Sequence, residues 1–475
     1  MMPRVGLRKN FQAIPMPLRT GIRRVRSWLP SRFRYHPAFQ RTYAMLKESQ
    51  WWDEHTIAIH QFRELKSLLQ EAAARVPYYG RLFAASGFDP DRFRGPSDLG
   101  KIPFLTKEIV RTRRMEFLAR GIEGSALDVV TTGGSTAEPL GFFKKSREYD
   151  AKEWAFNLVQ LERIGFDQRC RSVILRGERI RVTRNRFEQY DPLRRNLLLS
   201  SFHLSEENMP AYIDRIRSFS PDYIQAYPSV ITQLARYHRE NDLPGYSRLK
   251  GIICGSEPLY PWQRKLLTDT FRCRVFCIYG QTEQAALAGE CEHGTLYHVF
   301  PEYGYLELVD DEGQSIVTPG RTGEIVATGF INRIFPFIRY RTGDLATLAE
   351  GPCPCGRKYP LLAHIVGRQQ EFIFNRRNEA ISLGPVLFGI HDADMSCIRQ
   401  IQFFQNRPGN LILRVIKSPG ASNESVEAYI ARSLRTRLGD QFDIRVDFVQ
   451  RLPGTARGKH RFLEQAISPP PGDPA

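Results

Sequence analysis

Residues 222–283 read DYIQAYPSVITQLARYHRENDLPGYSRLKGIICGSEPLYPWQRKLLTDTFRCRVFCIYGQTE, and this stretch decides the fold. Three short apolar segments in it predict strands: Asp222–Tyr227, Leu249–Cys254 and Arg274–Tyr279. Between them, Ser229–Glu240 and Pro261–Phe271 have the apolar spacing of amphipathic helices. Parallel neighbours need a crossover helix, so the alternation predicts a doubly wound α/β sheet.

Each predicted strand is followed at once by a polar or glycine-bearing segment. These segments are Tyr227-Pro-Ser229, Gly255-Ser-Glu257 and Tyr279-Gly-Gln-Thr-Glu283. The carboxyl ends of parallel strands meet at one edge of a sheet, where ligands bind. The sequence therefore predicts a binding site built from these three segments.

The rest of the chain suggests two domains, because 475 residues exceed one ordinary core. Residues 304–345 are strand-rich and punctuated by glycine, which predicts a small antiparallel layer. Residues beyond Arg368 have a strand, hairpin, helix and strand pattern that is typical of a small α+β unit. We predict a basic arm (1–41), a large adenylation-type domain (42–367), a small mobile domain (368–467) and a disordered tail (468–475).

The formal net charge is +17, and the first 41 residues contain ten lysines and arginines without an acidic residue. Such an arm is suited to anionic lipid headgroups, although a solvated helix packed on the main domain is the favoured interpretation. No zinc finger or RNA-binding motif accompanies the charge, so nucleic acid is the weaker alternative. No apolar run reaches membrane-spanning length and no signal peptide is evident, so we expect a cytoplasmic protein with peripheral membrane contact as an option.

Three further segments carry residues suited to phosphate chemistry. Thr131–Pro139 combines hydroxyls and glycines that can approach phosphate oxygens, but it lacks the lysine of a P-loop. Arg339–Asp344 ends in a carboxylate that can accept hydrogen bonds from ribose hydroxyls. Leu452–His460 places a lysine in a glycine-flanked loop, where it can offset charge that develops on a phosphate. Each segment alone is weak evidence, because each is also an ordinary turn.

In this order the segments resemble the adenylate-forming superfamily, and within it the phenylacetate–CoA ligase and CapK branch. Two N-terminal segments are similar to that branch, Ala73–Tyr79 and Ile102–Lys107, as is Gly458–Leu463 near the C-terminus. The segment Ile401–Gln405 is more similar to CapK relatives than to the degradative ligases. The resemblance covers nearly the whole chain from about Leu46 onward.

The resemblance implies ATP and magnesium as cofactors, and roles for particular residues. The β- and γ-phosphates of ATP would be held by Thr132, Gly134, Ser135 and Thr136. The adenine pocket would be lined by Gly255, Ser256, Glu257 and Pro258, beside the motif Tyr279, Gly280, Gln281, Thr282 and Glu283.

Within that motif, Tyr279 would stack on adenine, Thr282 would contact the α-phosphate and Glu283 would bind magnesium. Asp344 and Arg368 would hold the ribose, and Arg368 with Gly367 would form the hinge of the small domain. Lys459 would stabilise the adenylation transition state.

The sequence also departs from the superfamily pattern. Ala137 and Glu138 stand where glycine and lysine are usual, and Gln370 occupies a hinge position that is commonly aspartate or lysine. Residues 379–389 differ from the glycine-containing stretch that receives pantetheine in thioester-forming relatives. Adenylation is therefore better supported than transfer to CoA.

Two pairs of residues suggest a structural zinc site, Cys291 with His293 and Cys353 with Cys355. Three thiols and one imidazole are the donor set of a closed tetrahedral site, although the pairs are spaced more tightly than in zinc fingers. His298 is a lesser candidate for the imidazole. The alternative is four unrelated loop residues kept reduced.

These features predict an enzyme that converts a carboxylic acid and ATP into an acyl-adenylate and pyrophosphate. The acyl acceptor is left open between CoA, a carrier protein and a sugar, with a role in surface polysaccharide biosynthesis as one setting. A non-catalytic CapK-like scaffold in polysaccharide assembly is the second hypothesis. Glu283, Asp344 and Lys459 argue against the scaffold, because a scaffold needs none of them.

We expect Lys459→Ala to abolish acid-dependent pyrophosphate release, because the charge of Lys459 is needed only while carboxylate and α-phosphate join. The variant should still transfer the acyl group of an acyl-adenylate supplied to it. The two half-reactions are measured separately, and an equal loss in both would contradict this division of labour.

Overall fold

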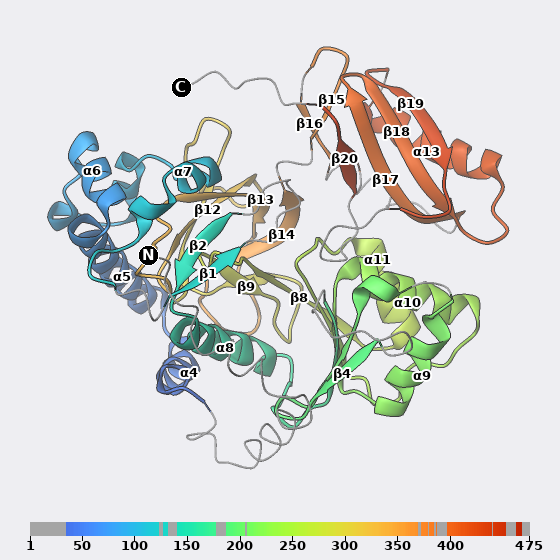
Figure 1. Ribbon diagram of the computed structural model, residues 1–475, viewed down its shortest axis with the longest axis horizontal. Coiled ribbons are helices and arrows are strands. Elements are labelled where there is room, and N and C mark those ends of the chain that lie inside the picture. The colour runs from blue at the N-terminus through green and yellow to red at the C-terminus, as the bar shows by residue number, and fades with distance from the viewer. Residues whose placement is uncertain are drawn as a thin grey trace, which may run out of the picture.

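The computed structural model describes residues 35–122, 127–131, 140–176, 187–204, 207–368, 372–378, 380–383, 386, 397–438, 440–452 and 462–467. A sheet of twelve strands forms its centre, in the order β11-β12-β13-β14-β10-β9-β8-β7-β6-β3-β5-β4. A separate small domain lies above α10 and α11 in Figure 1. Within the described residues, no helix combines the length and hydrophobicity needed to cross a bilayer.

One half of the sheet is parallel, as the repeating pattern predicts. Its strands are β5 (Asn196–Leu199), β3 (Ser172–Leu175), β6 (Tyr223–Ala226), β7 (Gly251–Gly255) and β8 (Arg274–Gly280). The edge strand β4 (Glu188–Asp191) runs antiparallel to β5. The helix predicted over 261–271 is α11 (Pro261–Phe271), and the one predicted over 229–240 is α10 (Pro228–Glu240).

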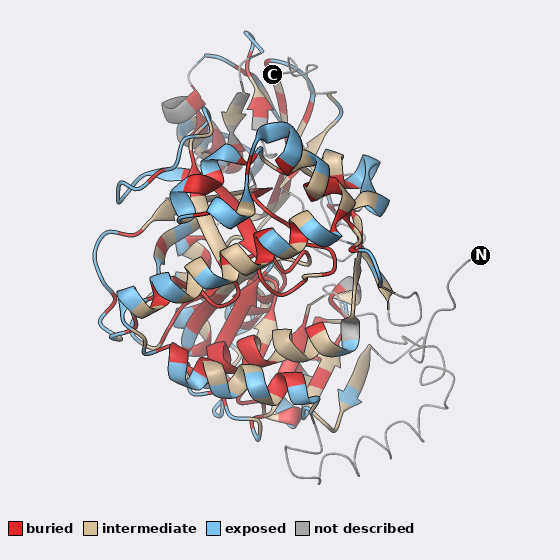
Figure 2. Cartoon of the chain, turned by 90° about the vertical axis from the view of Figure 1, so that its left-hand side faces the viewer, coloured by how far each residue is buried: buried red, intermediate tan, exposed pale blue. Residues whose placement is uncertain are grey.

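Helices cover both faces of the parallel half, which confirms the doubly wound arrangement. Ile252 and Cys254 of β7 pack toward α9 (Met209–Phe219), α10 and α11. Ile253, which points to the opposite face, packs with α4 (Pro37–Ser49) and α8 (Ser146–Glu162). Figure 2 shows helices that are buried on their inner faces and exposed on their outer faces, as amphipathic sequences require.

The other half of the sheet is antiparallel. Its strands are β9 (Leu287–Gly289), β10 (Tyr297–Val299), β14 (Leu361–Arg368), β13 (Tyr340–Leu348), β12 (Thr322–Gly329) and β11 (Gly304–Val309). The antiparallel layer predicted over 304–345 therefore continues the main sheet. A separate hairpin pairs β1 (Asp128–Thr131) with β2 (Gly141–Lys144).

The N-terminal part is helical, as predicted. It contains α5 (Glu54–Arg75), α6 (Pro77–Ser86) and α7 (Lys107–Thr112), with short 3-10 helices at Pro90–Arg92, Pro96–Lys101 and Arg114–Phe117. A further 3-10 turn, Ser201–His203, follows β5. The aromatic side chains of the N-terminal helices pack against β12 and β13 in one core cluster.

The small domain is an α+β unit, as predicted. Its sheet has the order β19-β18-β17-β20, with β17 (Ile398–Arg407), β18 (Asn410–Lys417), β19 (Asp443–Phe448) and β20 (Leu463–Gln465). Helix α13 (Asn423–Leu438) packs on this sheet, and β15 (Phe372–Phe374) pairs with β16 (Ala380–Ser382).

Side chains of the large domain reach the small one. Tyr260, at the start of α11, is 1% exposed and lies in the core cluster of the small domain, where its ring meets Phe462 edge-on at 5.6 Å between centroids. Arg236 of α10 donates to the carbonyl of Arg399, and Arg399 pairs with Glu240 at 3.2 Å. The small domain is thus docked on α10 and α11.

Two glycines allow the turn after β8 to lie against the antiparallel strands. A Cβ atom on Gly329 would lie 2.8 Å from the Gln284 carbonyl oxygen, and one on Gly304 would overlap the Ala285 carbonyl oxygen. Such approaches are closer than a side chain permits. The turn that carries Glu283 therefore depends on the absence of side chains in β11 and β12.

We expect Gly329→Ala to lower the free energy of unfolding by about 1–3 kcal/mol, because the added methyl group pushes the Gln284–Ala285 backbone away. Gly100→Ala is the matched control, since nothing lies within 4 Å of its Cβ position. Urea unfolding measures both variants. Equal stability of the two would show that the turn adapts without cost.

Candidate functional site

The predicted adenine segments lie at adjacent strand ends. Gly255 ends β7 and pairs with Ile278 of β8, and a Cβ on Gly255 would lie 3.0 Å from the Ile278 carbonyl oxygen. Tyr279 and Gly280 end β8 on the neighbouring strand. The carboxyl edge of the parallel half thus brings these two segments together, as the sequence predicts.

Tyr279 and Asp344, which are 65 positions apart, form a hydrogen bond. The Tyr279 hydroxyl donates to Asp344 Oδ2 at 2.8 Å, and Gln281 Nε2 donates to the same hydroxyl at 2.9 Å. Burial, together with the charge of Asp344, holds the pKa of Tyr279 well above its ordinary value. The phenol is therefore neutral at pH 7 and acts as a donor. The predicted adenine and ribose residues are side by side.

A second tyrosine–carboxylate pair holds Glu283. Its side chain is 8% exposed, and the hydroxyl of the fully buried Tyr340 donates to Glu283 Oε1 at 2.8 Å. A carboxylate held in this way is suited to a magnesium ion, which prefers oxygen ligands. Tyr340 lies inside the Arg339–Asp344 segment, but the sequence alone does not distinguish it, since a tyrosine in a strand is usually core.

The two N-terminal motifs support the same strand. Leu105 exchanges backbone hydrogen bonds with β13, donating to the Arg339 carbonyl at 2.9 Å and accepting from the Arg341 N–H at 2.9 Å. Lys107 Nζ donates to the Thr342 carbonyl at 3.1 Å. Tyr79 donates to the Pro336 carbonyl at 3.0 Å. Both motifs therefore fix the strand that presents Tyr340 and Asp344.

Glu257 and Pro258 have structural contacts of their own. Glu257 accepts from the backbone N–H and the hydroxyl of Ser229 at 3.0 and 3.1 Å, close to the start of α10. This contact favours a carboxylate because a helix N-terminus carries partial positive charge. A Cβ on Gly367 would lie 3.2 Å from Pro258 Cγ. The predicted hinge therefore lies against the predicted adenine pocket. Ser256, whose backbone has φ +68°, forms the turn between Gly255 and Glu257.

Asp344 and Arg368, the predicted ribose residues, are register partners in the β13–β14 pair. Their backbones therefore lie opposite each other. Thr282 directly precedes Glu283 and is partly exposed.

Five predicted residues lie outside the described residues: Thr132, Gly134, Ser135, Thr136 and Lys459. The first four belong to the segment that connects β1 to β2, and Lys459 belongs to the segment that connects β19 to β20. Their roles stay predictions.

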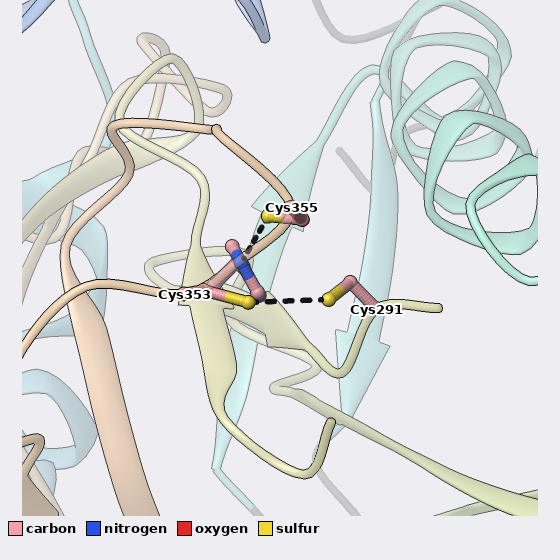
Figure 3. A group of neighbouring side chains, drawn as sticks. Cys291, Cys353 and Cys355 are labelled. Atoms are coloured by element: carbon pink, nitrogen blue, oxygen red, sulfur yellow. Dashed lines mark hydrogen bonds between the residues drawn. The ribbon is translucent and has the colours of Figure 1, made fainter. Parts of the chain in front are cut away.

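Three of the four predicted zinc ligands come together. Cys291 Sγ lies 3.5 Å from Cys353 Sγ, and Figure 3 shows Cys291, Cys353 and Cys355 directed toward one another. The nitrogen in this group belongs to His298 and not to His293: His298 Nε2 lies 3.1 Å from Cys355 Sγ, and the four ligand atoms all lie within 4.8 Å of one another.

His293 is exposed, and only its backbone N–H reaches the cluster, at 3.4 Å from Cys291 Sγ. The reason is strand pairing: β10 pairs with β9 through His298 and Gly289, which fixes the ring of His298 under the cysteine loops. We name Cys291, His298, Cys353 and Cys355 the thiol cluster.

The surroundings of the thiol cluster fit a metal bound by thiolates. Burial lowers the pKa of His298 to about 4, so its ring is neutral at pH 7, and Nδ1 faces the Leu296 carbonyl at 3.2 Å. A proton on Nδ1 leaves the lone pair of Nε2 for a metal. Burial alone would raise the pKa of Cys355, but hydrogen bonds from Arg357 outweigh it and hold that pKa below its usual range.

A buried cation beside the thiol cluster also suits an anionic group. Arg163 is 5% exposed, and its Nε and one terminal nitrogen have no hydrogen-bond partner among the described residues. Its guanidinium lies over the rings of Phe300 and Tyr359. One zinc ion with three thiolates and one imidazole carries a net charge of −1, which Arg163 and Arg357 would offset.

Four aromatic residues, Phe142, Phe143, Tyr223 and Tyr227, have side chains that could form the walls of a pocket for the acid, but most of them belong to the core. Phe142 is fully buried, and Tyr223 and Tyr227 are 1% and 6% exposed within the main core clusters. Phe143 keeps partial exposure.

Family models match two parts of the chain. One for AMP-binding enzymes matches residues 197–332, and one for the CapK C-terminal domain matches residues 377–466. The first covers the strands that carry Tyr279 and Glu283, and the second covers most of the small domain.

Individual relatives agree with these matches. Protein CapK from Staphylococcus aureus is 24% identical over 77% of this chain and 80% of its own length. A phenylacetate-coenzyme A ligase from Thermus thermophilus is 26% identical over 66% of this chain and 71% of its own length. A crystal structure of 2-hydroxyisobutyryl-CoA ligase in its postadenylation state has the same fold, with a TM-score of 0.72 at 18% identity over 88% of this chain and 93% of that one.

Taken with the two tyrosine-bound carboxylates Glu283 and Asp344, these matches support an adenylate-forming ligase that is similar to the phenylacetate–CoA ligase and CapK branch of the adenylate-forming superfamily.

Proposed function

We propose that this enzyme binds ATP with magnesium and joins its α-phosphate to a carboxylic acid, releasing pyrophosphate. The observation that carries the proposal is the pair of contacts Tyr279–Asp344 and Tyr340–Glu283, which fix two carboxylates beside the end of β8. Asp344 offers an acceptor to ribose hydroxyls next to the ring of Tyr279. Glu283 offers a magnesium ligand next to the hydroxyl of Thr282.

Each residue has a separate task in this proposal. Glu283 would hold a magnesium ion, which would supply positive charge to offset the phosphates of ATP. Tyr279 and Asp344 orient the nucleoside, so that the α-phosphate lies near Thr282. The carboxylate of the acid then attacks in line, and Lys459 and the hydroxyls of Thr132, Ser135 and Thr136 neutralise the charge that builds up.

Transfer to CoA is the acceptor step that the relatives support, because two kinds of them are named as CoA ligases. A carrier-protein thiol or a sugar remains the alternative acceptor, and the similarity to CapK favours a setting in capsular polysaccharide biosynthesis. The basic arm is suited to work beside an anionic membrane. A scaffold without catalysis is the second hypothesis, and the retained Glu283 and Asp344 speak against it.

The decisive experiment is ATP–pyrophosphate exchange across a panel of carboxylic acids. We expect exchange with at least one acid and a loss of about 100-fold or more in Glu283→Gln, because the neutral amide is a poor magnesium ligand. Glu312→Gln is the matched control at an exposed glutamate and should retain exchange. Binding of ATP without exchange for any acid would favour the scaffold.

We further propose that the thiol cluster holds one structural zinc ion. Zinc bound there would connect the loop after β9, which contains Cys291, to the loop before β14, which contains Cys353 and Cys355. The first loop follows β9 and the second precedes β14. Both strands belong to the sheet that carries the proposed nucleotide site. The ion would stabilise that edge without contacting a reacting atom.

We expect the purified chain to contain about one zinc ion per molecule and Cys355→Ser to lose it, since a closed site needs all four ligands. Cys397→Ser, outside the cluster, should keep the metal. Elemental analysis measures the content, and thermal unfolding with and without a chelator measures the effect on Tm. Full zinc content in Cys355→Ser would contradict the assignment.

A further inference from the structure

A buried polar group lies directly behind the predicted magnesium ligand. Glu153 of α8 accepts at Oε2 from the Tyr303 hydroxyl and from Gln284 Nε2, the latter at 3.1 Å. Tyr303 is fully buried and Gln284 is 4% exposed, whereas Glu153 keeps partial exposure. We name Glu153, Gln284 and Tyr303 the polar trio. No step in the proposed adenylation uses it.

Gln284 carries two features that cost free energy. Its backbone has φ +59°, in the left-handed region that side chains other than glycine rarely adopt. Its Oε1 is buried and has no hydrogen-bond partner among the described residues. An orphaned buried acceptor and a strained backbone each cost on the order of 1–3 kcal/mol. Such costs concentrate at ligand sites, where a bound group recovers them.

The orientation of the Gln284 amide follows from its neighbour. Nε2 faces the Glu153 carboxylate, so exchanging the nitrogen and oxygen would put two acceptors in contact. Oε1 therefore has to receive a donor from elsewhere. Glu153 Oε1 has only a weak hydrogen bond within the described part of the chain, which comes from Asn157 Nδ2 at 3.4 Å. Two acceptors in the trio lack a good donor.

The position of the trio relates it to the acid substrate. Gln284 directly follows Glu283, and Thr282 precedes both. Tyr279 and Asp344 occupy the nucleoside side of this turn. The acid meets the α-phosphate near Thr282, and its remaining atoms have to extend away from the nucleoside. Gln284 belongs to the turn itself, Glu153 lies on α8 and Tyr303 directly precedes β11, so the trio connects the turn to two other parts of the large domain.

The charges around Glu153 favour a hydrogen-bond donor from the substrate next to its carboxylate. Lys144 of β2 is paired with Asp150 at 2.6 Å, and it attracts Glu153 only over a longer distance. Burial raises the pKa of Glu153, while the donors from Tyr303 and Gln284 oppose the rise. A hydrogen-bond donor from the substrate would complete both acceptors. An apolar group placed there would leave them unpaired.

We propose that Gln284 and Glu153 bind a hydroxyl or ammonium group on the carboxylic acid that this enzyme activates. The inference rests on the proposed adenylation and narrows its substrate class to acids that carry a hydrogen-bond donor besides the carboxyl group. Plain fatty acids and unsubstituted aryl acids are then poor substrates. A site built to hydrogen-bond a substrate group rejects the analogue that lacks it more strongly than an apolar pocket rejects a methylene.

The test compares matched acids by ATP–pyrophosphate exchange. Butanoate and phenylacetate serve as parents, and each is compared with its hydroxyl- and amino-substituted forms at every carbon. We expect at least one substituted acid to exceed its parent by about 10-fold or more in kcat/KM. Exchange with the parents and no preference for any substituted acid would overturn the inference and leave adenylation intact. No exchange with any acid would count against the proposed adenylation itself.

Variants of the trio test the residues. Gln284→Leu removes the orphaned acceptor at similar volume, and it should reduce the ratio of substituted to parent acid toward one. Glu148→Gln, on the same helix and paired with Lys152, is the matched control and should keep the ratio. An unchanged ratio in a folded Gln284→Leu would overturn the inference.

Glu153→Gln provides a second, nearly isosteric variant if Gln284→Leu does not fold. Glu153→Gln distinguishes the two donor groups. Loss of the negative charge should lower kcat/KM for an acid with an ammonium group by more than 10-fold relative to an acid with a hydroxyl group. If neither kind of acid responds to Glu153→Gln or Gln284→Leu, the trio is a structural network and has no role in substrate choice.

Discussion

The site depends on one constraint: two tyrosine hydroxyls cross between two segments, and each donates to a carboxylate of the other segment. Buried Tyr340 donates to buried Glu283, and Tyr279 donates to Asp344, both of which are partly exposed. Tyr279 reaches from β8 to β13, and Tyr340 reaches from β13 to the turn after β8. A buried carboxylate without such a donor is costly. The crossed pair therefore fixes the two segments to each other.

This constraint explains why the sheet is mixed. In the strand order, β14, β10 and β9 lie between β13 and β8, so the two segments meet only because the sheet twists and curls. The parallel half supplies the open carboxyl edge, and the antiparallel half returns β13 to it. Gly304 and Gly329 let the turn after Glu283 rest on this half without a side chain between. The N-terminal motifs hold β13 in place through hydrogen bonds. Leu105 and Lys107 bond to the backbone of Arg339–Thr342, and Tyr79 donates to the Pro336 carbonyl just before it.

Buried polar groups mark two further places in the large domain. The thiol cluster lies beside the buried cation Arg163, and the polar trio contains Gln284. In the part of the chain that the structure describes, two nitrogens of Arg163 and Oε1 of Gln284 have no hydrogen-bond partner. Each arrangement is costly by itself and becomes favourable when a group of the right charge is present. An anionic metal–thiolate centre, as proposed above, would satisfy the first, and a donor on the proposed substrate would satisfy the second. Unpaired polar groups in a buried site are costly. This cost favours the crossed tyrosine–carboxylate contacts, and it also leads to both proposals.

The sequence by itself determined the repeating part of the fold. The hydrophobic period over residues 222–283 is local, and it placed α11 at its observed bounds and β6, β7 and β8 within two residues of theirs. It also indicated Tyr279 and Glu283, because polar residues that follow buried strands collect at one sheet edge. Asp344 was indicated by the carboxylate that ends the Arg339–Asp344 segment and by the family resemblance. Only the tertiary structure decided contacts between distant segments, such as Tyr340 with Glu283. It also chose His298 over His293, since the nearest histidine in sequence faces solvent, whereas the β9–β10 register buries the farther one against the cysteines. Local patterns record periodicity, but which distant side chains share a buried space depends on strand pairing and on the cost of leaving polar atoms unpaired.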